Sequence, residues 1–279
     1  MDYSAIFPYQ MKPLKIVPFN QLEISTRTEL GNLETNINLN NFFKYVEIVY
    51  IQQSEIKRTK IKIKEIKPPG SILSVCYCGQ YRGVQTRQSP KPFLNQASFI
   101  MSVDTTNVNF KLFNNGIIQI TGCKTKQHGY DIIKYVVQHG KSIEKKHNII
   151  IFETEPCLTN LKTAMINVDF DLGFNIDRNA LDANIDGLNG FKSCYDSGLS
   201  NSGVSVKIER PQENSSHKKH DSFICFHTGS VILSGNDLTR MEEIYYLFHR
   251  SIDMIKDKIV SNIKNIKLQR IKLKIKLDV

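Results

Sequence analysis

The sequence has 279 residues, 41% of them hydrophobic, so it is long enough to bury a sizeable core. Lys and Arg number 37 against 27 Asp and Glu, and the resulting net charge of +10 favours polyanionic partners, nucleic acid first. No apolar window approaches the roughly 18 residues of a membrane-spanning helix, and residues 1–10 lack a signal-peptide pattern, so we expect a soluble intracellular protein.

The cysteine pattern and the motif content indicate neither a metal site nor an enzyme. The six cysteines contain no C-x-x-C, and a chain of this length does not need disulfides, so we expect reduced thiols. Cys76 and Cys78 would share one face of a strand, where core packing is favoured over a zinc pair. No P-loop, G-x-G-x-x-G, H-E-x-x-H or G-x-S-x-G motif occurs, so we expect no catalysis, no metal and no cofactor.

The first half of the chain predicts a strand, a helix, several antiparallel strands and a second helix. Residues 24–49 change from a strand-like run to a helix that Asn38 can cap. Residues 107–113 and 117–121 alternate around an Asn-Gly turn, as the two strands of a hairpin do. Residues 79–96 are interpreted as a loop insertion. The buried stripes of the two helices are Leu39, Phe42, Phe43 and Val46, and then Tyr130, Ile133, Val136 and Val137, ended by Gly140.

The second half predicts the same order of elements. Residues 165–185 give a strand and then a helix that Asp177 can cap. Residues 197–222 are interpreted as the matching loop, and a hairpin follows them. Asn236 or Asp237 can cap the last helix. The buried stripes are Leu181 and Ile185 in the first of these helices, and Leu238, Met241, Tyr245, Phe248, Ile252 and Ile255 in the second.

A repeated phrase indicates that the two halves are copies of one unit. "LFNNGIIQITGCKT" at 112–125 returns as "CFHTGSVILSGND" at 225–237, and the offset is constant because 226−113, 229−116 and 235−122 all equal 113. The predicted fold class is α+β, with both helices of each half on one face of an antiparallel sheet. The predicted organisation is an N-terminal arm (1–20), two repeats (21–146 and 147–260) and a basic C-terminal tail (261–279).

One face of the predicted sheet is apolar, and the other, which we call the open face, is mixed. In the first hairpin the core positions are Val108, Phe110, Leu112, Ile118 and Ile120, and the open positions are Asn109, Lys111, Phe113, Gln119 and Thr121. In the second hairpin the core positions are Phe223, Cys225, Val231 and Leu233, and the open positions are Ile224, Phe226, Ile232 and Ser234. The second open face is unusually apolar for a surface in water.

The repeated phrase resembles the TATA-binding protein family. The first copy has an aromatic-x-x-Gly segment from Phe113 to Gly116, a short β run, and Thr-Gly-x-Lys from Thr121 to Lys124. The second copy has Asp237 in place of the lysine. The resemblance extends over about residues 21–260. It is greatest to the divergent members of the family that large DNA viruses encode. It implies a saddle: a curved ten-stranded antiparallel sheet with four helices on its convex back and a pseudo-two-fold axis between the halves.

The resemblance implies a transcription initiation factor that binds A·T-rich double-stranded promoter DNA through the minor groove. The family is itself a standard example of apolar wedges inserted into that groove. The implied partners are DNA, a B-type transcription initiation factor and the RNA polymerase machinery. The resemblance also implies a monomer without membrane association, in the nucleus or a cytoplasmic viral factory of an infected cell.

By resemblance, specific residues are expected to bind DNA. The intercalating positions are Phe113 and Phe226, with Phe191 as a further wedge of the second half. The groove-lining positions are Gln119, Thr121, Ile232 and Ser234, and Asn167 is the candidate for a central asparagine. Lys111 shares the open face. Exposed lysines of the helix side that could meet acidic partners or upstream DNA are Lys124, Lys126, Lys134, Lys141, Lys145 and Lys146.

Several positions depart from the family pattern. The family has two intercalating phenylalanines in each half, but the first-half partner position falls near 68–70, a Pro-Pro-Gly segment without an aromatic residue. Leu22 stands at the place of the first central asparagine. Asp169 and Asp171 are expected on the open face, where carboxylates repel phosphates. The first half carries Arg27 and Glu29 at similar positions.

Alternative interpretations stay open at this stage. The hairpin phenylalanines could be rim aromatics that pack under their own turns. The basic runs at 57–67 and 264–279 are typical of strand edges protected from aggregation, and less so of polyanion-binding segments. The chain could be a saddle that has lost strong DNA binding and serves as a protein scaffold in viral transcription. A third possibility is a non-specific nucleic-acid binder acting through its basic tails.

Overall fold

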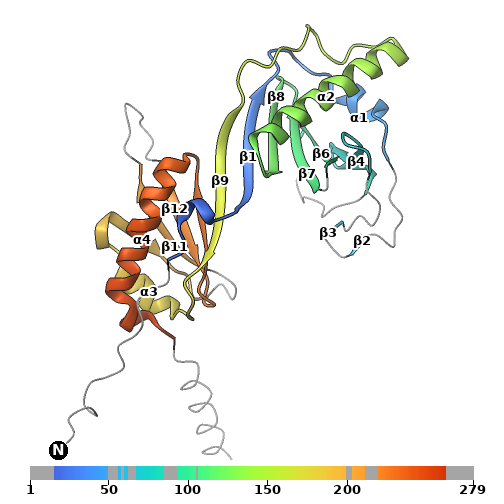
Figure 1. Ribbon diagram of the computed structural model, residues 1–279. Helices are drawn as coiled ribbons and strands as arrows, with labels where there is room; N and C mark the ends of the chain where they lie inside the picture. Colours follow the sequence, from blue (N-terminus) through green and yellow to red (C-terminus); the bar gives the residue numbers. More distant parts are fainter. Residues whose placement is uncertain are drawn as a thin grey trace, which may run out of the picture. The chain divides into compact units, whose positions relative to one another are not determined.

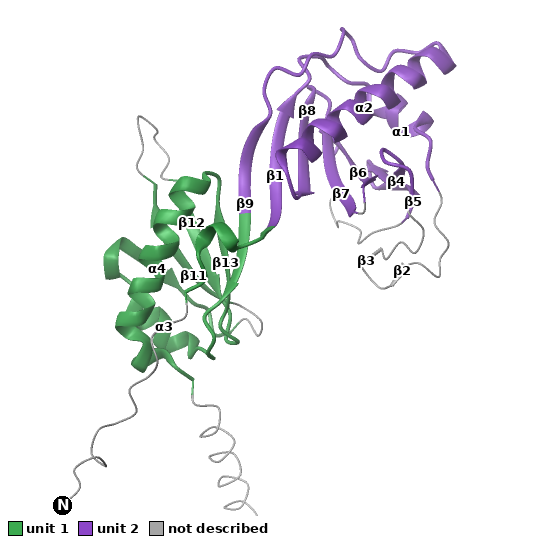
Figure 2. Ribbon diagram, viewed as in Figure 1, with its two compact units in different colours: residues 1–24, 167–279 green, residues 25–166 purple. Residues whose placement is uncertain are grey.

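The computed structural model describes residues 16–49, 56–57, 60–61, 67–84, 93–104, 106–198, 203–210 and 219–261. The chain divides into two compact units (Figure 2): unit 2 contains residues 25–166, and unit 1 contains residues 1–24 and 167–279. Most of the basic runs at 57–67 and 264–279, and the first fifteen residues of the predicted arm, lie outside the described residues.

Unit 2 is an open antiparallel sheet with two helices (Figure 1). Its strands lie in the order β9, β1, β8, β7, β6, β4, β5, with β9 contributing residues 162–166. Helix α1 packs on β4 and β6, and α2 packs on β6 and β8. The elements are β1 (Ile24–Asn32), α1 (Leu39–Tyr45), β4 (Ile72–Tyr77), β5 (Gln80–Gly83), β6 (Gln96–Val103), β7 (Thr106–Phe113), β8 (Ile117–Cys123) and α2 (Lys126–His147), with a separate pair β2 (Ile56–Lys57) and β3 (Lys60–Ile61).

Unit 1 has the same plan with shorter connections. Its strands lie in the order β10, β11, β12, β13, β9, with β9 contributing residues 167–171. Helix α3 packs on β10 and β11, and α4 packs on β13 (Figure 1). The elements are β9 (Lys162–Asp171), α3 (Arg178–Ile185), β10 (Phe191–Cys194), β11 (Val204–Glu209), β12 (His220–Cys225), β13 (Ser230–Gly235) and α4 (Leu238–Ile259), with short 3-10 turns η2 (Phe19–Gln21) and η4 (Leu188–Gly190). The predicted α+β class, with an open antiparallel sheet and helices, is confirmed.

Helices α1, α3 and α4 begin at predicted caps. The side chain of Asn38 accepts a hydrogen bond from the backbone N–H of Asn41 at 2.9 Å, and Asp177 accepts one from Ala180 at 3.1 Å. Asp237, one of two candidates for the last helix, accepts from Arg240 at 2.8 Å. Each cap satisfies an N–H that the first turn of a helix leaves unpaired, worth about 1 kcal/mol.

The core of each unit lies between the sheet and its helices. In unit 2, Phe99 and Phe110 of neighbouring strands stack with ring centroids 4.7 Å apart. In unit 1, Phe223 of β12 stacks on Phe248 of α4 at 4.2 Å. All four side chains are fully buried, so the alternation of each hairpin places its apolar face against helices, as predicted.

The two units repeat the same backbone hydrogen bonds. Leu33 N–H donates to the carbonyl of Gly116, and Leu172 N–H donates to that of Gly229. Ile37 and Ile176 likewise pair with Asn114 and His227. The first strands and helices therefore correspond with an offset of 139 (172−33 and 176−37), and the hairpins with the predicted offset of 113 (229−116). The internal repeat predicted from the sequence is present in the hydrogen bonding.

Both turn glycines sit where no side chain fits. A Cβ on Gly116 would approach the carbonyl oxygen of Thr35 to 2.3 Å, and one on Gly229 would approach that of Phe174 to 2.2 Å. Both have φ in the left-handed region, +82° and +91°. The glycines shared by the repeated phrase thus let the segment after the first strand of each repeat pass close to its hairpin.

Both predicted loops contain a strand. β5 lies within 79–96 and brings the sheet of the described residues to eleven strands, where the resemblance implied ten. β11 lies within 197–222, and its residues Val204, Val206 and Ile208 are buried in alternation with polar ones. The prediction of a loop at 197–222 was wrong because flanking Ser, Asn and Gly residues concealed the alternation of buried and polar side chains in β11.

The predicted repeat boundary at 146/147 stays a prediction, while the compact units meet at 166/167. The segment after α2 belongs with unit 2, because Cys157 and Thr159 donate backbone hydrogen bonds to Leu33 and Asn32. Residues 16–24, mostly within the predicted arm, belong with unit 1. There the hydroxyl of Tyr245 donates to the carbonyl of Val17 at 2.8 Å.

Candidate nucleic-acid interface

The open face of unit 2 is built by β7, β8 and β1. Cross-strand pairs bring Asn109 beside Thr121 and Lys111 beside Gln119. Leu30 of β1 pairs with Gln119 and is 38% exposed. Phe113 ends β7 on the same face and is half-buried. Apart from Lys111 these positions carry no charge.

The open face of unit 1 is more apolar at its centre. Ile224 pairs with Ile232 and Ser222 pairs with Ser234 across β12 and β13. Asn167 of β9 lies beside them, because the Ser234 hydroxyl donates to its side-chain oxygen at 2.8 Å. Phe226 follows β12 and is half-buried. The structure therefore brings Asn167, Ser234, Ile232 and Phe226 together on one face, as the resemblance implies.

The candidate positions correspond pairwise between the units. With the offset of 113, Phe113 corresponds to Phe226 and Thr121 to Ser234. The remaining pair differs in chemistry, because Lys111 and Gln119 of unit 2 correspond to Ile224 and Ile232 of unit 1. The two open faces share geometry while one is polar and basic and the other aliphatic.

Unit 1 also presents two carboxylates. Asp169 and Asp171 alternate with the buried Val168 and Leu172 and are exposed, as predicted. Asp171 is held in place, since it accepts hydrogen bonds from the backbone N–H of Gly173 at 2.7 Å and from the Ser230 hydroxyl at 3.1 Å. These charges lie beside the aliphatic centre of the face and oppose binding of a phosphate backbone there.

Phe191 is not a wedge, and that prediction was wrong. Its side chain is fully buried and packs edge-on against Phe223 at 5.9 Å and Phe248 at 6.0 Å. It pairs with Ile208 on the helix side of β10, as Ile72 pairs with Met101 in unit 2. Without the strand register, an aromatic residue near the expected place could not be distinguished from a core residue.

Two other predicted correspondences were also wrong. The residue across from Phe113 is Gln96, whereas Gly70 donates its N–H to Ser102 at the other end of β6. Leu22 precedes β1. The offset of 139 instead makes Thr28 the residue of unit 2 that corresponds to Asn167. Both corrections depend on strand register, which the sequence does not fix in a segment with long insertions.

Arg27 and Glu29 lie on the helix side of unit 2, not on the open face. Glu29 is fully buried and forms an ion pair with Arg27 at 3.0 Å. The Thr163 hydroxyl donates to Glu29 at 3.0 Å and accepts from Arg27 at 3.0 Å. Burial and the nearby charge of Glu29 raise the pKa of the Cys123 thiol to about 11. A shift of β1 register at Arg27 and Thr28 accompanies this arrangement.

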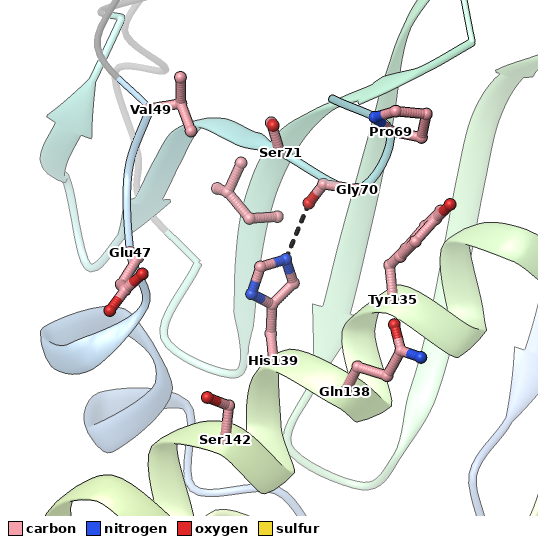
Figure 3. A pocket seen from close by; sticks show the side chains of 10 residues that line it. Glu47, Val49, Pro69, Gly70, Ser71, Tyr135, Gln138, His139 and Ser142 are labelled. Atoms are coloured by element: carbon pink, nitrogen blue, oxygen red, sulfur yellow. Dashed lines mark hydrogen bonds between the residues drawn. The ribbon is translucent and has the colours of Figure 1, made fainter. Parts of the chain in front are cut away.

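A pocket of about 420 Å³ lies on the helix side of unit 2 (Figure 3). His139 of α2 faces it, with Nε2 2.8 Å from the carbonyl oxygen of Gly70. Glu47 at its rim is engaged by Lys146, whose hydrogen bond and charge lower the pKa of that carboxyl. Since α2 forms one wall, the pocket is separate from the open face.

Within the described ranges, no helix is both long and apolar enough to span a membrane. In the same part of the chain, no group of three or more His, Cys, Asp or Glu side chains is arranged to hold a metal ion. Of the predicted DNA-binding residues, all but Phe191 lie on the two open faces.

Comparisons with known proteins agree with the repeated phrase. No protein-family model matches the sequence. A protein named TATA-box-binding protein-like, from Acanthamoeba polyphaga mimivirus, is 25% identical over 272 residues, covering 88% of this chain and 68% of that protein. The resemblance to the TATA-binding protein family is confirmed. A solved structure named Methanococcus jannaschii TBP is 14% identical, with coverage of 84% of this chain and 98% of that one and a TM-score of 0.45.

Proposed function

We propose that this TATA-binding-protein-like chain is a non-catalytic transcription initiation factor that binds A·T-rich promoter DNA through the minor groove. It would act where promoters are transcribed, in the nucleus or a cytoplasmic viral factory. The observation that carries the proposal is the matched placement of Phe113 and Phe226 at hairpin ends, each beside an open face. Their equivalence rests on hydrogen bonds as well as on sequence, because Gly116 and Gly229 donate to the two phenylalanine carbonyls.

The chemistry of the open faces fits a minor groove. That groove offers few hydrogen-bond distinctions, and A·T pairs present only acceptors there. Gln119 and Lys111 can donate to such acceptors, while Ile224 and Ile232 can pack against the groove without leaving a polar group unpaired. Half-buried aromatic side chains at the hairpin ends are suited to wedge between base pairs.

Anisotropy titrations with A·T-rich and scrambled duplexes test the proposal. We expect Phe226→Ala and Phe113→Ala each to weaken binding to the A·T-rich duplex about tenfold, the stacking contribution of one aromatic residue. Met254→Ala, which removes an exposed apolar side chain of α4, is the matched control and should change nothing. Equal affinity for both duplexes in the parent protein, lost steeply with salt, would instead indicate binding through the basic tails.

A second function, as a protein scaffold, is favoured by one observation. Asp169 and Asp171 are exposed on the open face of unit 1, where they oppose DNA and would suit a basic protein partner. Absence of duplex binding at low salt, together with capture of a basic peptide by the parent and not by Asp169→Asn, would support this function over the first.

For the initiation machinery, we propose contacts on the helix side of unit 2. Lys126, Lys134 and Lys145 of α2 are exposed there, whereas Lys141 and Lys146 form ion pairs with Glu155 and Glu47. A B-type initiation factor with an acidic surface would then bind more weakly to Lys134→Glu, with DNA binding of the variant unchanged. Equal recruitment by parent and variant would remove this surface from consideration.

A further inference from the structure

The segment before β6 exposes two large apolar side chains beside Phe113. Leu94 is 72% exposed, the highest value among the large hydrophobic residues that the structure describes, and Phe93 is 63% exposed. Neighbouring apolar side chains left in water mark surfaces that bind something, because each gains about 25 cal/mol for every Å² covered.

Hydrogen bonds fix this segment against the hairpin end that holds Phe113. The backbone N–H of Asn114 donates to the carbonyl of Asn95 at 3.1 Å, and Gln96 pairs directly with Phe113. Phe93 and Leu94 therefore precede by two or three residues the point where β6 begins beside Phe113. The result is a pair of exposed apolar side chains at the hairpin end of unit 2 that holds Phe113.

The charge of the neighbouring face favours DNA as the occupant. The open positions of β6, β7 and β8 carry no carboxylate, and Lys111 lies two residues before Phe113. A basic surface that ends in exposed aromatic and aliphatic side chains can contact a phosphate and also enter a base step.

Unit 1 lacks this feature among its described residues. Val204 pairs with Cys225, so the residue across from Phe226 is Gly203, which has no side chain. A Cβ at Gly203 would come within 2.6 Å of the Ile224 side chain. The hairpin ends of the two units, at Phe113 and at Phe226, are therefore chemically unequal.

We propose that Phe93 and Leu94, with Phe113, form the apolar wedge that unstacks a base step where DNA contacts unit 2. The proposal rests on the function proposed above. It assigns the larger distortion of the duplex to unit 2, because Phe226 of unit 1 has no such neighbours among the described residues.

Duplexes with 2-aminopurine at single positions across a T-A-rich centre test this assignment. The base brightens when it is unstacked, a signal that a structural role of Phe93 and Leu94 would not change. For the variant Phe93→Ala with Leu94→Ala, we expect the strongest brightening to disappear at one end of the site and binding to weaken about tenfold. The slope of log K against log salt should be unchanged in this variant. Lys111→Ala should instead reduce the magnitude of the slope by about 0.9, the contribution of one phosphate contact.

The outcomes separate this proposal from the function on which it rests. If the double variant binds the duplex and changes 2-aminopurine fluorescence as the parent does, while Phe113→Ala and Phe226→Ala weaken binding, the wedge assignment is wrong. The proposed DNA-binding function then stands. If none of these variants alters duplex binding, the proposed function fails and the wedge with it. Met254→Ala is the matched exposed control, and amide exchange of β6 and β7 should show that the double variant keeps its fold.

Discussion

Units 1 and 2 form equivalent backbone hydrogen bonds, but they differ in which core positions carry an ionisable group. The offset of 139 places Val168 of unit 1 where unit 2 has Glu29, and the offset of 113 places Val108 of unit 2 where unit 1 has Asp221. The N-caps Thr125 and Asp237 align the long helices with an offset of 112, which places Val137 where unit 1 has His249. The repeated fold thus accepts a polar group at a core position in one copy and an apolar residue in the other.

The three groups differ in how well their surroundings compensate burial. Glu29 has an arginine and a threonine hydroxyl, and Asp221 accepts from Arg210 at 2.7 Å with Arg240 3.6 Å away. Neither ring nitrogen of His249 has a hydrogen-bond partner among the described residues, and its neighbours are aromatic rings of Phe170, Tyr245 and Phe248. Duplicated backbone geometry therefore does not determine the electrostatics of the core, and each copy compensates locally.

The largest expected effect comes from breaking the compensation of Glu29. Arg27→Ile leaves a buried carboxylate without its charge partner and should lower the stability of unit 2 by about 3 kcal/mol. The offset of 139 assigns Ile166 and Val168 of β9 to these positions, so the double variant Arg27→Ile with Glu29→Val copies the other repeat. It should recover most of the loss, because an apolar pair of similar volume removes the buried charge.

Hydrogen exchange of the β1 and β8 amides measures this effect locally. Faster exchange in Arg27→Ile than in the double variant is the expected order. If the double variant exchanges at least as fast as the single one, the two strands are not interchangeable at these positions, and the correspondence between the repeats fails in β1.

His249 should give unit 1 a dependence on pH that Val137, the corresponding residue of unit 2, cannot give. Burial lowers the pKa of this histidine to about 4, so the folded protein keeps it neutral where the unfolded chain takes up a proton. Stability from this group is present above pH 6.5 and is lost as pH falls from 6.5 towards 4. The loss amounts to about 3 kcal/mol, from the difference between the histidine pKa of 6.5 in the unfolded chain and about 4 in the folded protein.

The variant His249→Val, which copies Val137, removes both the unpaired nitrogens and the titration. We expect a gain of about 1 kcal/mol at pH 7 and a larger gain near pH 4. Exchange of α4 amides at the two pH values measures both, with the exposed His220→Gln as control. An equal acid sensitivity in parent and variant would show that another group controls it.

The sequence predicted the elements that depend on local patterns and missed those that depend on register. Caps at Asn38 and Asp177, the core face of each hairpin and the repeat itself follow from neighbouring residues. The positions of Phe191, Leu22, Arg27 and Glu29 depend on which strand residues face each other across a turn or an insertion. A slip of one residue exchanges the two faces of a strand, and no local signal marks it. The strand correspondence became visible only through repeated hydrogen bonds such as those of Leu33 and Leu172.

The smallest expected effect concerns the open faces, where Leu30 of unit 2 corresponds to Asp169 of unit 1. Under the DNA-binding function, Asp169→Asn removes a charge that repels phosphates and should strengthen duplex binding by about 1 kcal/mol, roughly fivefold, at low salt. Asp253→Asn, an equal change of charge on the exposed side of α4, is the control and should have a smaller effect. The difference between the two should shrink as salt rises, because screening weakens interactions between exposed charges.

Equal gains from both substitutions would mean that DNA responds only to net charge, and the open face of unit 1 would then not contact the duplex. A gain confined to Asp169→Asn would place that strand beside the phosphates and would show that the acidic residues on the open face of unit 1 limit the affinity for DNA.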